Sequence, residues 1–273
     1  MTRIETTFAT LQANGKKALI PYVMAGDPKP SVTVDLLHDL VKHGADMIEL
    51  GLPFSDPMAD GETIALAGER ALAGGTSTRQ AIEMVAKFRK NDQDTPIILM
   101  GYLNPVEIIG YDNFITLCTD AGVDGLLMVD LPAAEAGNFT KQLADKQINE
   151  IFLLSPTTLP ERRQQVLKSC GGYIYYVSLK GVTGSASLDT NEVGKQVQAI
   201  KADTALPVCV GFGIRDGASA KAIGQYADGV IVGSELVKNF ANVGDDNGKI
   251  EQAKASLLAK MDELRLALDS LER

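Results

Sequence analysis

Basic side chains are too few in this sequence to balance the acidic ones. Lys and Arg number 26 against 35 Asp and Glu, which gives a formal net charge of −9 and a pI near 4.8. Nucleic acids and anionic membrane surfaces are polyanions, so neither is expected to be the main partner. Any anionic ligand must therefore be held by local groups.

Cysteine and histidine are scarce as well. Cys118, Cys170 and Cys209 are odd in number and widely spaced, without the short spacing of a zinc or redox motif, so we expect reduced thiols and a cytoplasmic protein. His38 and His43 lie five residues apart with no acid or cysteine cluster beside them. The sequence therefore predicts no metal site.

Long apolar runs are also missing. No segment approaches the roughly 20 residues that span a bilayer, and the first residues lack the apolar core of a signal peptide, so we expect a soluble chain that is not exported. What is present is 45% hydrophobic residues over 273 positions, enough for a sizeable core. Length alone leaves one large domain or two small ones open.

Eight short apolar runs alternate with helical patterns, which is typical of βα units and a parallel sheet. The predicted strands are residues 18–24, 47–52, 97–103, 125–129, 150–154, 173–179, 207–212 and 229–232. Helical patterns include residues 31–42, 77–91, 133–146, 159–169, 192–201 and 218–225. An amphipathic segment comes first, and residues 248–273 predict one long helix with an apolar stripe formed by Leu257, Leu258, Met261, Leu264 and Leu268.

This alternation predicts an α/β fold, a TIM (β/α)8 barrel with an extra N-terminal helix and a long C-terminal helix, as a single domain over residues 1–273. Active sites of such barrels lie at the C-terminal ends of the strands, often with a phosphate site after strands seven and eight. An open doubly wound sheet is the alternative, disfavoured because no Gly-x-Gly-x-x-Gly follows the first run.

Two carboxylates stand out in residues 49–61, Glu-Leu-Gly-Leu-Pro-Phe-Ser-Asp-Pro-Met-Ala-Asp-Gly. Glu49 ends the second strand, where a buried charge is costly and usually kept for function. Asp60 follows across a loop broken by two prolines. Such a pair can do proton chemistry. The alternatives are a scaffold ion pair for Glu49 and ordinary Asp-Gly turn chemistry for Asp60.

Glycines end the later strands and predict a phosphate site. They occur as Gly181-Val-Thr-Gly184, Gly211-Phe-Gly213 and Gly233-Ser234. The last pair opens a short helical segment whose free N–H groups and positive dipole end suit a phosphate. An apolar floor for a flat aromatic ligand is predicted from Tyr22, Met100, Leu127, Val129, Leu153, Tyr175 and Phe212. Tight turns and simple core filling are the respective alternatives.

Together these motifs resemble the tryptophan synthase alpha chain family of TIM-barrel lyases over nearly the whole chain, and residues 49–61 are the most specific of them. The resemblance implies retro-aldol cleavage of indole-3-glycerol phosphate to indole and glyceraldehyde 3-phosphate in the last steps of tryptophan biosynthesis. It implies that Glu49 transfers the protons and that Asp60 stabilises positive charge on the ring nitrogen. The implied substrate-binding residues are Tyr22, Met100, Leu127, Tyr175, Thr183 and Phe212, and the implied phosphate-binding residues are Gly184, Gly213, Gly233 and Ser234.

The resemblance also implies a lid, residues 179–188, that closes with Thr183 near Asp60, and a role for Tyr175 in positioning or relaying a proton. The sequence Ser185-Ala186-Ser187 departs from the family pattern, and Tyr22 stands where the family often has phenylalanine. The implied partner is the pyridoxal-phosphate beta chain, two alpha with two beta, meeting residues 53–60 and 102–105. No cofactor is expected in this chain.

Other functions stay open on sequence alone. One is another phosphate-handling barrel, such as an isomerase or a synthase that forms indole-3-glycerol phosphate, although no predicted strand end carries an obvious catalytic lysine. A second is a chain that mainly activates its partner. A third is a stand-alone indole producer.

Overall fold

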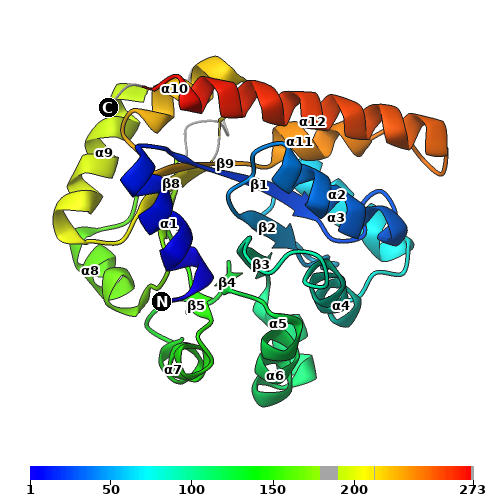
Figure 1. The fold of residues 1–273 in the computed structure, drawn as a ribbon. Coiled ribbons are helices and arrows are strands. Elements are labelled where there is room, and N and C mark those ends of the chain that lie inside the picture. Colours follow the sequence, from blue (N-terminus) through cyan, green and yellow to red (C-terminus); the bar gives the residue numbers. More distant parts are fainter. Residues whose placement is uncertain (179–189, 212, 272–273) are drawn as a thin grey trace.

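The computed structural model describes residues 1–178, 190–211 and 213–271 (Figure 1). Its strands are β1 Ala18–Met24, β2 Ile48–Gly51, β3 Ile97–Gly101, β4 Gly125–Met128, β5 Asn149–Glu150, β6 Phe152–Leu154, β7 Ile174–Val177, β8 Val208–Gly211 and β9 Gly229–Val232. Its helices are α1 Arg3–Asn14, α2 Pro30–Lys42, α3 Glu62–Ala73, α4 Thr78–Phe88, α5 Leu103–Ile109, α6 Tyr111–Ala121, α7 Gly137–Asp145, α8 Pro160–Ser169, α9 Thr190–Asp203, α10 Gly217–Gly224, α11 Ser234–Val237, the 3-10 turn η1 Lys238–Phe240 and α12 Asn247–Asp269.

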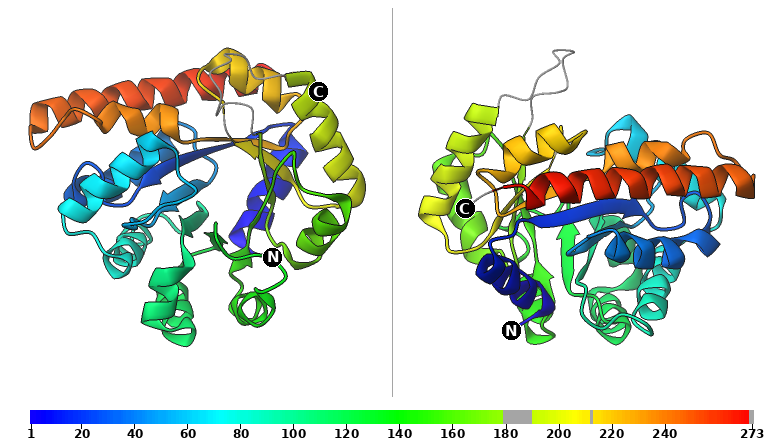
Figure 2. Two further views of the ribbon diagram at one scale, coloured as in Figure 1. Left: turned by 180° about the vertical axis from the view of Figure 1, so that it is seen from behind. Right: turned by 45° about the horizontal axis from the view of Figure 1, so that its top comes forward.

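The strands pair in parallel in the order β5-β4-β3-β2-β1-β9-β8-β7-β6. The two ends of this order, β5 and β6, follow each other in the chain and are separated only by Ile151, whose N–H donates to the Leu126 carbonyl at 2.8 Å. The sheet therefore closes on itself, with helices in a ring around it (Figures 1 and 2). The predicted TIM barrel is confirmed, with its fifth strand divided in two.

Alternate side chains of the strands fill the barrel, as the two-residue period of a strand requires. The interior cluster contains Ala18, Ile20, Met47, Ile98, Leu127, Ile151, Tyr173, Tyr175, Cys209 and Ile231. Ile4, Phe8 and Leu11 of α1 belong to the same cluster. Helix α1 therefore closes the barrel at the N-terminal ends of the strands and leaves the opposite end for the site.

Three aspartates act alike at this closed end. Asp46, Asp124 and Asp228 each precede a strand and accept a backbone N–H from the first or second residue of an adjacent strand, Leu19, Ile97 and Val208 respectively, at 2.8–2.9 Å. Each is also paired with a cation: Asp46 with Arg265, Asp124 with Arg3 and Arg89, and Asp228 with Lys201. These acids therefore satisfy strand ends, which is a structural role.

The outer helices agree in part with expectation. In α12 the side chains of Leu257, Met261, Leu264 and Leu268 are at most 1% exposed, and Leu258 is partly buried against the same core, so the predicted stripe is confirmed with Leu258 at its edge. Helices α3, α5 and α6 were not predicted, and none of them begins with a side chain that caps its first turn. No helix among the described residues is long and apolar enough to cross a membrane.

Candidate active site

Glu49 lies on β2 between Tyr22 of β1 and Ile98 of β3 and is 0% exposed. Its Oε1 accepts a hydrogen bond from the Tyr173 hydroxyl at 2.5 Å, and its buried Oε2 has no partner within the described chain. Burial raises the pKa of this carboxyl to about 8, against the opposing effect of the Tyr173 bond. Glu49 therefore carries a proton near neutral pH and can donate it.

Asp60 lies directly before Gly61, the residue that precedes α3. The Tyr102 hydroxyl hydrogen-bonds to the Asp60 carboxyl and accepts the Ala59 N–H at 3.0 Å. The Phe54 ring packs on Tyr102 with centroids 5.2 Å apart. Partial burial raises the pKa of Asp60, while the Tyr102 bond lowers it. The loop therefore holds its carboxylate in a fixed, partly desolvated place.

Two tyrosines occupy the space left by glycines on neighbouring strands. A Cβ built on Gly51 would lie 2.1 Å from the Tyr22 hydroxyl, and one on Gly211 would lie 2.2 Å from the Tyr175 hydroxyl. Burial and then the charges of Asp60 and Glu49 raise the pKa of Tyr22 well above its ordinary value. Tyr22 therefore stays protonated and stands near both carboxylates.

The structure brings most of the predicted floor together. Tyr22 and Tyr175 are 6% and 7% exposed, and Met100 is partly buried and packs against the interior cluster of Tyr175 and against a smaller cluster that contains Tyr22. Leu127 is 0% exposed, so in this structure it fills the core beneath them. Phe212 lies outside the described residues.

The predicted phosphate site is placed in part. Gly233 precedes α11, and a Cβ built on it would lie 3.4 Å from the Tyr22 Cβ, so the start of α11 approaches the floor. The first N–H groups of a helix have no intrahelical acceptor. Ser234 and Gly213 are exposed, and Gly213 has a φ of 78°. Thr183, Gly184 and the predicted lid 179–188 lie outside the described residues.

Sequence reasoning missed two residues that contact the carboxylates. Tyr173 rather than Tyr175 hydrogen-bonds Glu49, and it lies directly before β7, two positions ahead of Tyr175 and in the same interior cluster. The period of two along a strand could have indicated it. Tyr102 was considered only as partner surface, yet it is 3% exposed and bonds the loop of Asp60. Its place directly after β3 was the available signal.

Both histidines contact side chains of neighbouring helices. His43 Nδ1 lies 2.8 Å from Asp262, and His38 stacks on Phe88 with centroids 4.6 Å apart. Cys118, Cys170 and Cys209 are unpaired. Among the residues that the structure places, no group of three or more His, Cys, Asp or Glu could hold a metal ion.

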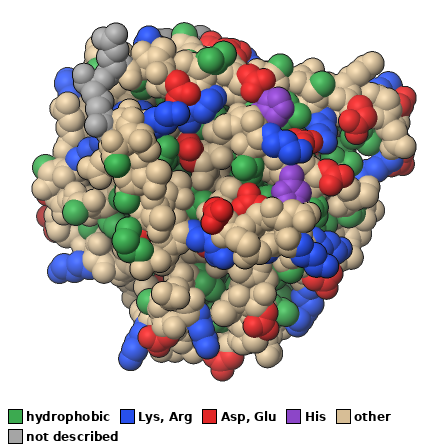
Figure 3. Space-filling view, in the orientation of Figure 1, with side chains coloured by type: hydrophobic (Ala, Val, Ile, Leu, Met, Phe, Trp, Pro, Cys, Tyr) green, Lys and Arg blue, Asp and Glu red, His purple; other side chains and the backbone are tan. Residues whose placement is uncertain are grey.

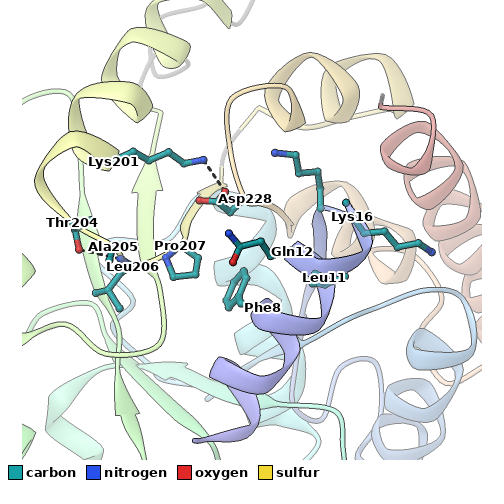
Figure 4. A pocket seen from close by; sticks show the side chains of 12 residues that line it. Phe8, Leu11, Gln12, Lys16, Lys201, Thr204, Ala205, Leu206, Pro207 and Asp228 are labelled. Atoms are coloured by element: carbon teal, nitrogen blue, oxygen red, sulfur yellow. Dashed lines mark hydrogen bonds and ion pairs between the residues drawn. The ribbon is translucent and has the colours of Figure 1, made fainter. Parts of the chain in front are cut away.

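A cavity of about 390 Å³ opens at the other end of the barrel, between α1 and the residues before β8 (Figure 4). Phe8 and Gln12 face it from α1, and Lys201 at its edge reaches Asp228 at 2.7 Å. That pair holds the beginning of β8. Acidic and basic side chains are interspersed over this side of the molecule (Figure 3). The cavity is therefore bounded by structural groups at the closed end of the barrel.

Removing the Tyr173 hydroxyl tests its effect on Glu49. In Tyr173→Phe the ionised form of Glu49 loses a hydrogen bond, so its pKa rises further and the alkaline limb of kcat/KM moves to higher pH. The measurement is the dependence of kcat/KM on pH. Tyr176→Phe, on the helix-facing side of the same strand, should leave the limb in place. An unmoved limb in Tyr173→Phe would contradict this role.

The chain is similar to known proteins in both sequence and structure. The family model of the tryptophan synthase alpha chain matches residues 8–267. The chain is 74% identical to the alpha chain of Psychrobacter arcticus over 272 residues, covering 99% of this chain and 98% of that one. It is 56% identical to that of Acinetobacter baumannii, covering 99% and 100%. The crystal structure of subunit alpha from Legionella pneumophila is similar at 43% identity with a TM-score of 0.91, covering 99% and 100%.

Proposed function

The chain belongs to the tryptophan synthase alpha chain family, a lyase family of tryptophan biosynthesis, and on that premise we propose how its residues cleave indole-3-glycerol phosphate. The reaction gives indole and glyceraldehyde 3-phosphate. The observation that carries the assignment is Glu49, a fully buried carboxyl at the open end of the barrel with one oxygen free and a pKa raised to about 8.

Glu49 first donates its proton to indole C3, which places positive charge on the ring nitrogen. Asp60, whose carboxylate Tyr102 holds, stabilises that charge. The bond between C3 and the side chain then breaks, its electrons return to the ring, and the adjacent hydroxyl becomes the aldehyde. The hydroxyl proton passes to Glu49, which restores the starting state. Both proton transfers and the charge stabilisation come from side chains, so we propose that this chain needs no cofactor or metal.

Binding divides between the two ends of the substrate. Tyr22, Met100 and Tyr175 would contact the indole ring, with Leu127 beneath them. The phosphate would bind backbone N–H groups at Gly213, Gly233 and Ser234. We further propose from the sequence motifs that Thr183 and Phe212 contact the substrate and that Gly184 binds the phosphate. Fixing both ends sets the breaking bond beside Glu49, which aids catalysis by positioning.

Membership of the family implies a beta-chain partner. We propose a complex of two alpha and two beta chains, with pyridoxal phosphate in the beta chain only. The surface on this chain would be residues 53–60 and the start of α5. Met58 in the first of these segments is 83% exposed, and Ile108 near the end of α5 is 79% exposed, so both could be covered by a partner. A cytoplasmic location is a further expectation from the three unpaired thiols.

A steady-state indole assay tests the proposal. The purified chain should release indole from indole-3-glycerol phosphate, and adding the beta chain should raise the rate about tenfold, within the usual range of coupling between sites. Ring closure of an anilino sugar phosphate, with no indole released, would instead indicate a synthase. A rise only in the beta chain's own rate, unchanged by loss of Glu49 and Asp60, would indicate an activator.

A further inference from the structure

Helix α3 forms a wall shared by the two ends of the candidate site. It begins at Glu62, two residues after Asp60. Its Ala67 and Ala71 are 0% exposed and belong to a small cluster with Tyr22 of β1 and Val237 of α11. One rigid element therefore connects the loop of Asp60 with the helix proposed to bind phosphate.

The last turn of α3 is held by a directional ion pair. Arg70 Nε lies 2.7 Å from Asp27 Oδ1, and its Nη2 lies 2.9 Å from Oδ2. Asp27 is 3% exposed and follows β1, with its N–H donating to the Met24 carbonyl at 3.2 Å. Two parallel bonds between a planar guanidinium and a carboxylate fix orientation as well as distance. The pair therefore ties the far end of α3 to the end of β1.

Stability alone is a weak reason for this pair. Burying a charged pair costs about as much free energy as the mutual attraction returns. Burial raises the pKa of Asp27 even though Arg70 opposes the shift, so desolvation is the larger effect here. The other effect of the pair is the geometric constraint that it places on α3. The loop directly before the opposite end of this helix carries Asp60.

We propose that Asp27 and Arg70 are positioning residues for the cleavage reaction, because their paired hydrogen bonds fix α3 and thereby set Asp60 relative to α11. The inference rests on the proposed function and deepens it. When α11 holds the phosphate, the length of the substrate sets the distance from α11 to the ring nitrogen, and Asp60 must lie at the matching place. Displacement of about 1 Å at a reacting group can reduce turnover by up to about 100-fold. A loosened α3 would therefore impair the charge stabilisation at Asp60.

The test variant is Arg70→Lys, which keeps the charge and removes the two-bond geometry. We expect kcat for indole release to fall about tenfold with KM changed less than threefold, since the phosphate contacts remain. In an Asp60→Asn background the same change should cost little more, because the effect passes through Asp60. Asp27→Asn is the second variant and should behave alike. Circular dichroism and denaturant unfolding establish that each variant folds.

Arg265→Lys is the matched control. Arg265 also pairs with a partly buried aspartate, Asp46, at 2.9 Å, but at the closed end of the barrel. It should lower the free energy of unfolding without changing kcat. Wild-type kcat in Arg70→Lys, or losses that multiply in the double variant with Asp60→Asn, would overturn the positioning role. If the wild-type chain releases no indole, the proposed function fails instead, so the two failures are distinguishable.

Discussion

Glu49→Gln should lose nearly all indole release, with kcat reduced about 10³-fold, within the range of general acid–base catalysis. Glutamine keeps the shape and can still accept the Tyr173 hydroxyl bond, but it can neither donate nor accept the transferred proton. The measurement is steady-state indole release at saturating substrate. Full activity in this variant would remove Glu49 from the mechanism and with it the proposed lyase chemistry.

The same variant has a pH signature in its stability. Burial raises the pKa of Glu49 from its ordinary value of 4.5 to about 8 in the folded protein, so the folded state binds more protons than the unfolded state between these values. The wild-type free energy of unfolding therefore falls as pH rises from about 4.5 to 8, and then levels. Glutamine removes this dependence, so the variant should gain relative stability across that window, by a few kcal/mol.

Glu150→Gln is the control for both measurements. Glu150 is 3% exposed with a pKa raised to about 7, but it faces Thr140 of α7 on the outside of the barrel. It should show the same sign of pH-dependent stability and retain kcat. Loss of turnover in Glu150→Gln would mean that buried carboxyls matter here for folding and not for chemistry.

Asp60→Asn should reduce kcat about 100-fold or more, with KM little changed. Asparagine can accept a hydrogen bond from the ring N–H, but it carries no negative charge to stabilise the positive ring in the transition state. The assay is indole release by the chain alone. Asp56→Asn is the matched control, because Asp56 lies in the same loop, is exposed, and its side chain accepts a hydrogen bond only from its neighbour Ser55 among the described residues. Equal losses in both variants would indicate disturbance of the loop and not loss of a charge.

The strand order and the barrel could be predicted because short-range patterns are strong there. Apolar runs of four to seven residues, separated by helical periods, match β1 and β9 to the residue. Helix α3 could not be predicted, since it follows Gly61 without a capping side chain and its alanines are selected by packing against β1 and α11. The break between β5 and β6 at Ile151 likewise depends on closure of the barrel.

The sequence by itself determined the barrel, the acidic segment 49–61 and the glycines at the strand ends, because these follow from local periodicity, composition and motif. Only the tertiary structure decided which side chains surround the two carboxylates. Tyr173 reaches Glu49 across 124 positions of sequence, and Arg70 reaches Asp27 across 43. Such contacts depend on how strands and helices are placed in space. Burial, which raises the pKa of Glu49, has the same origin: it is a property of the closed barrel and of no local pattern.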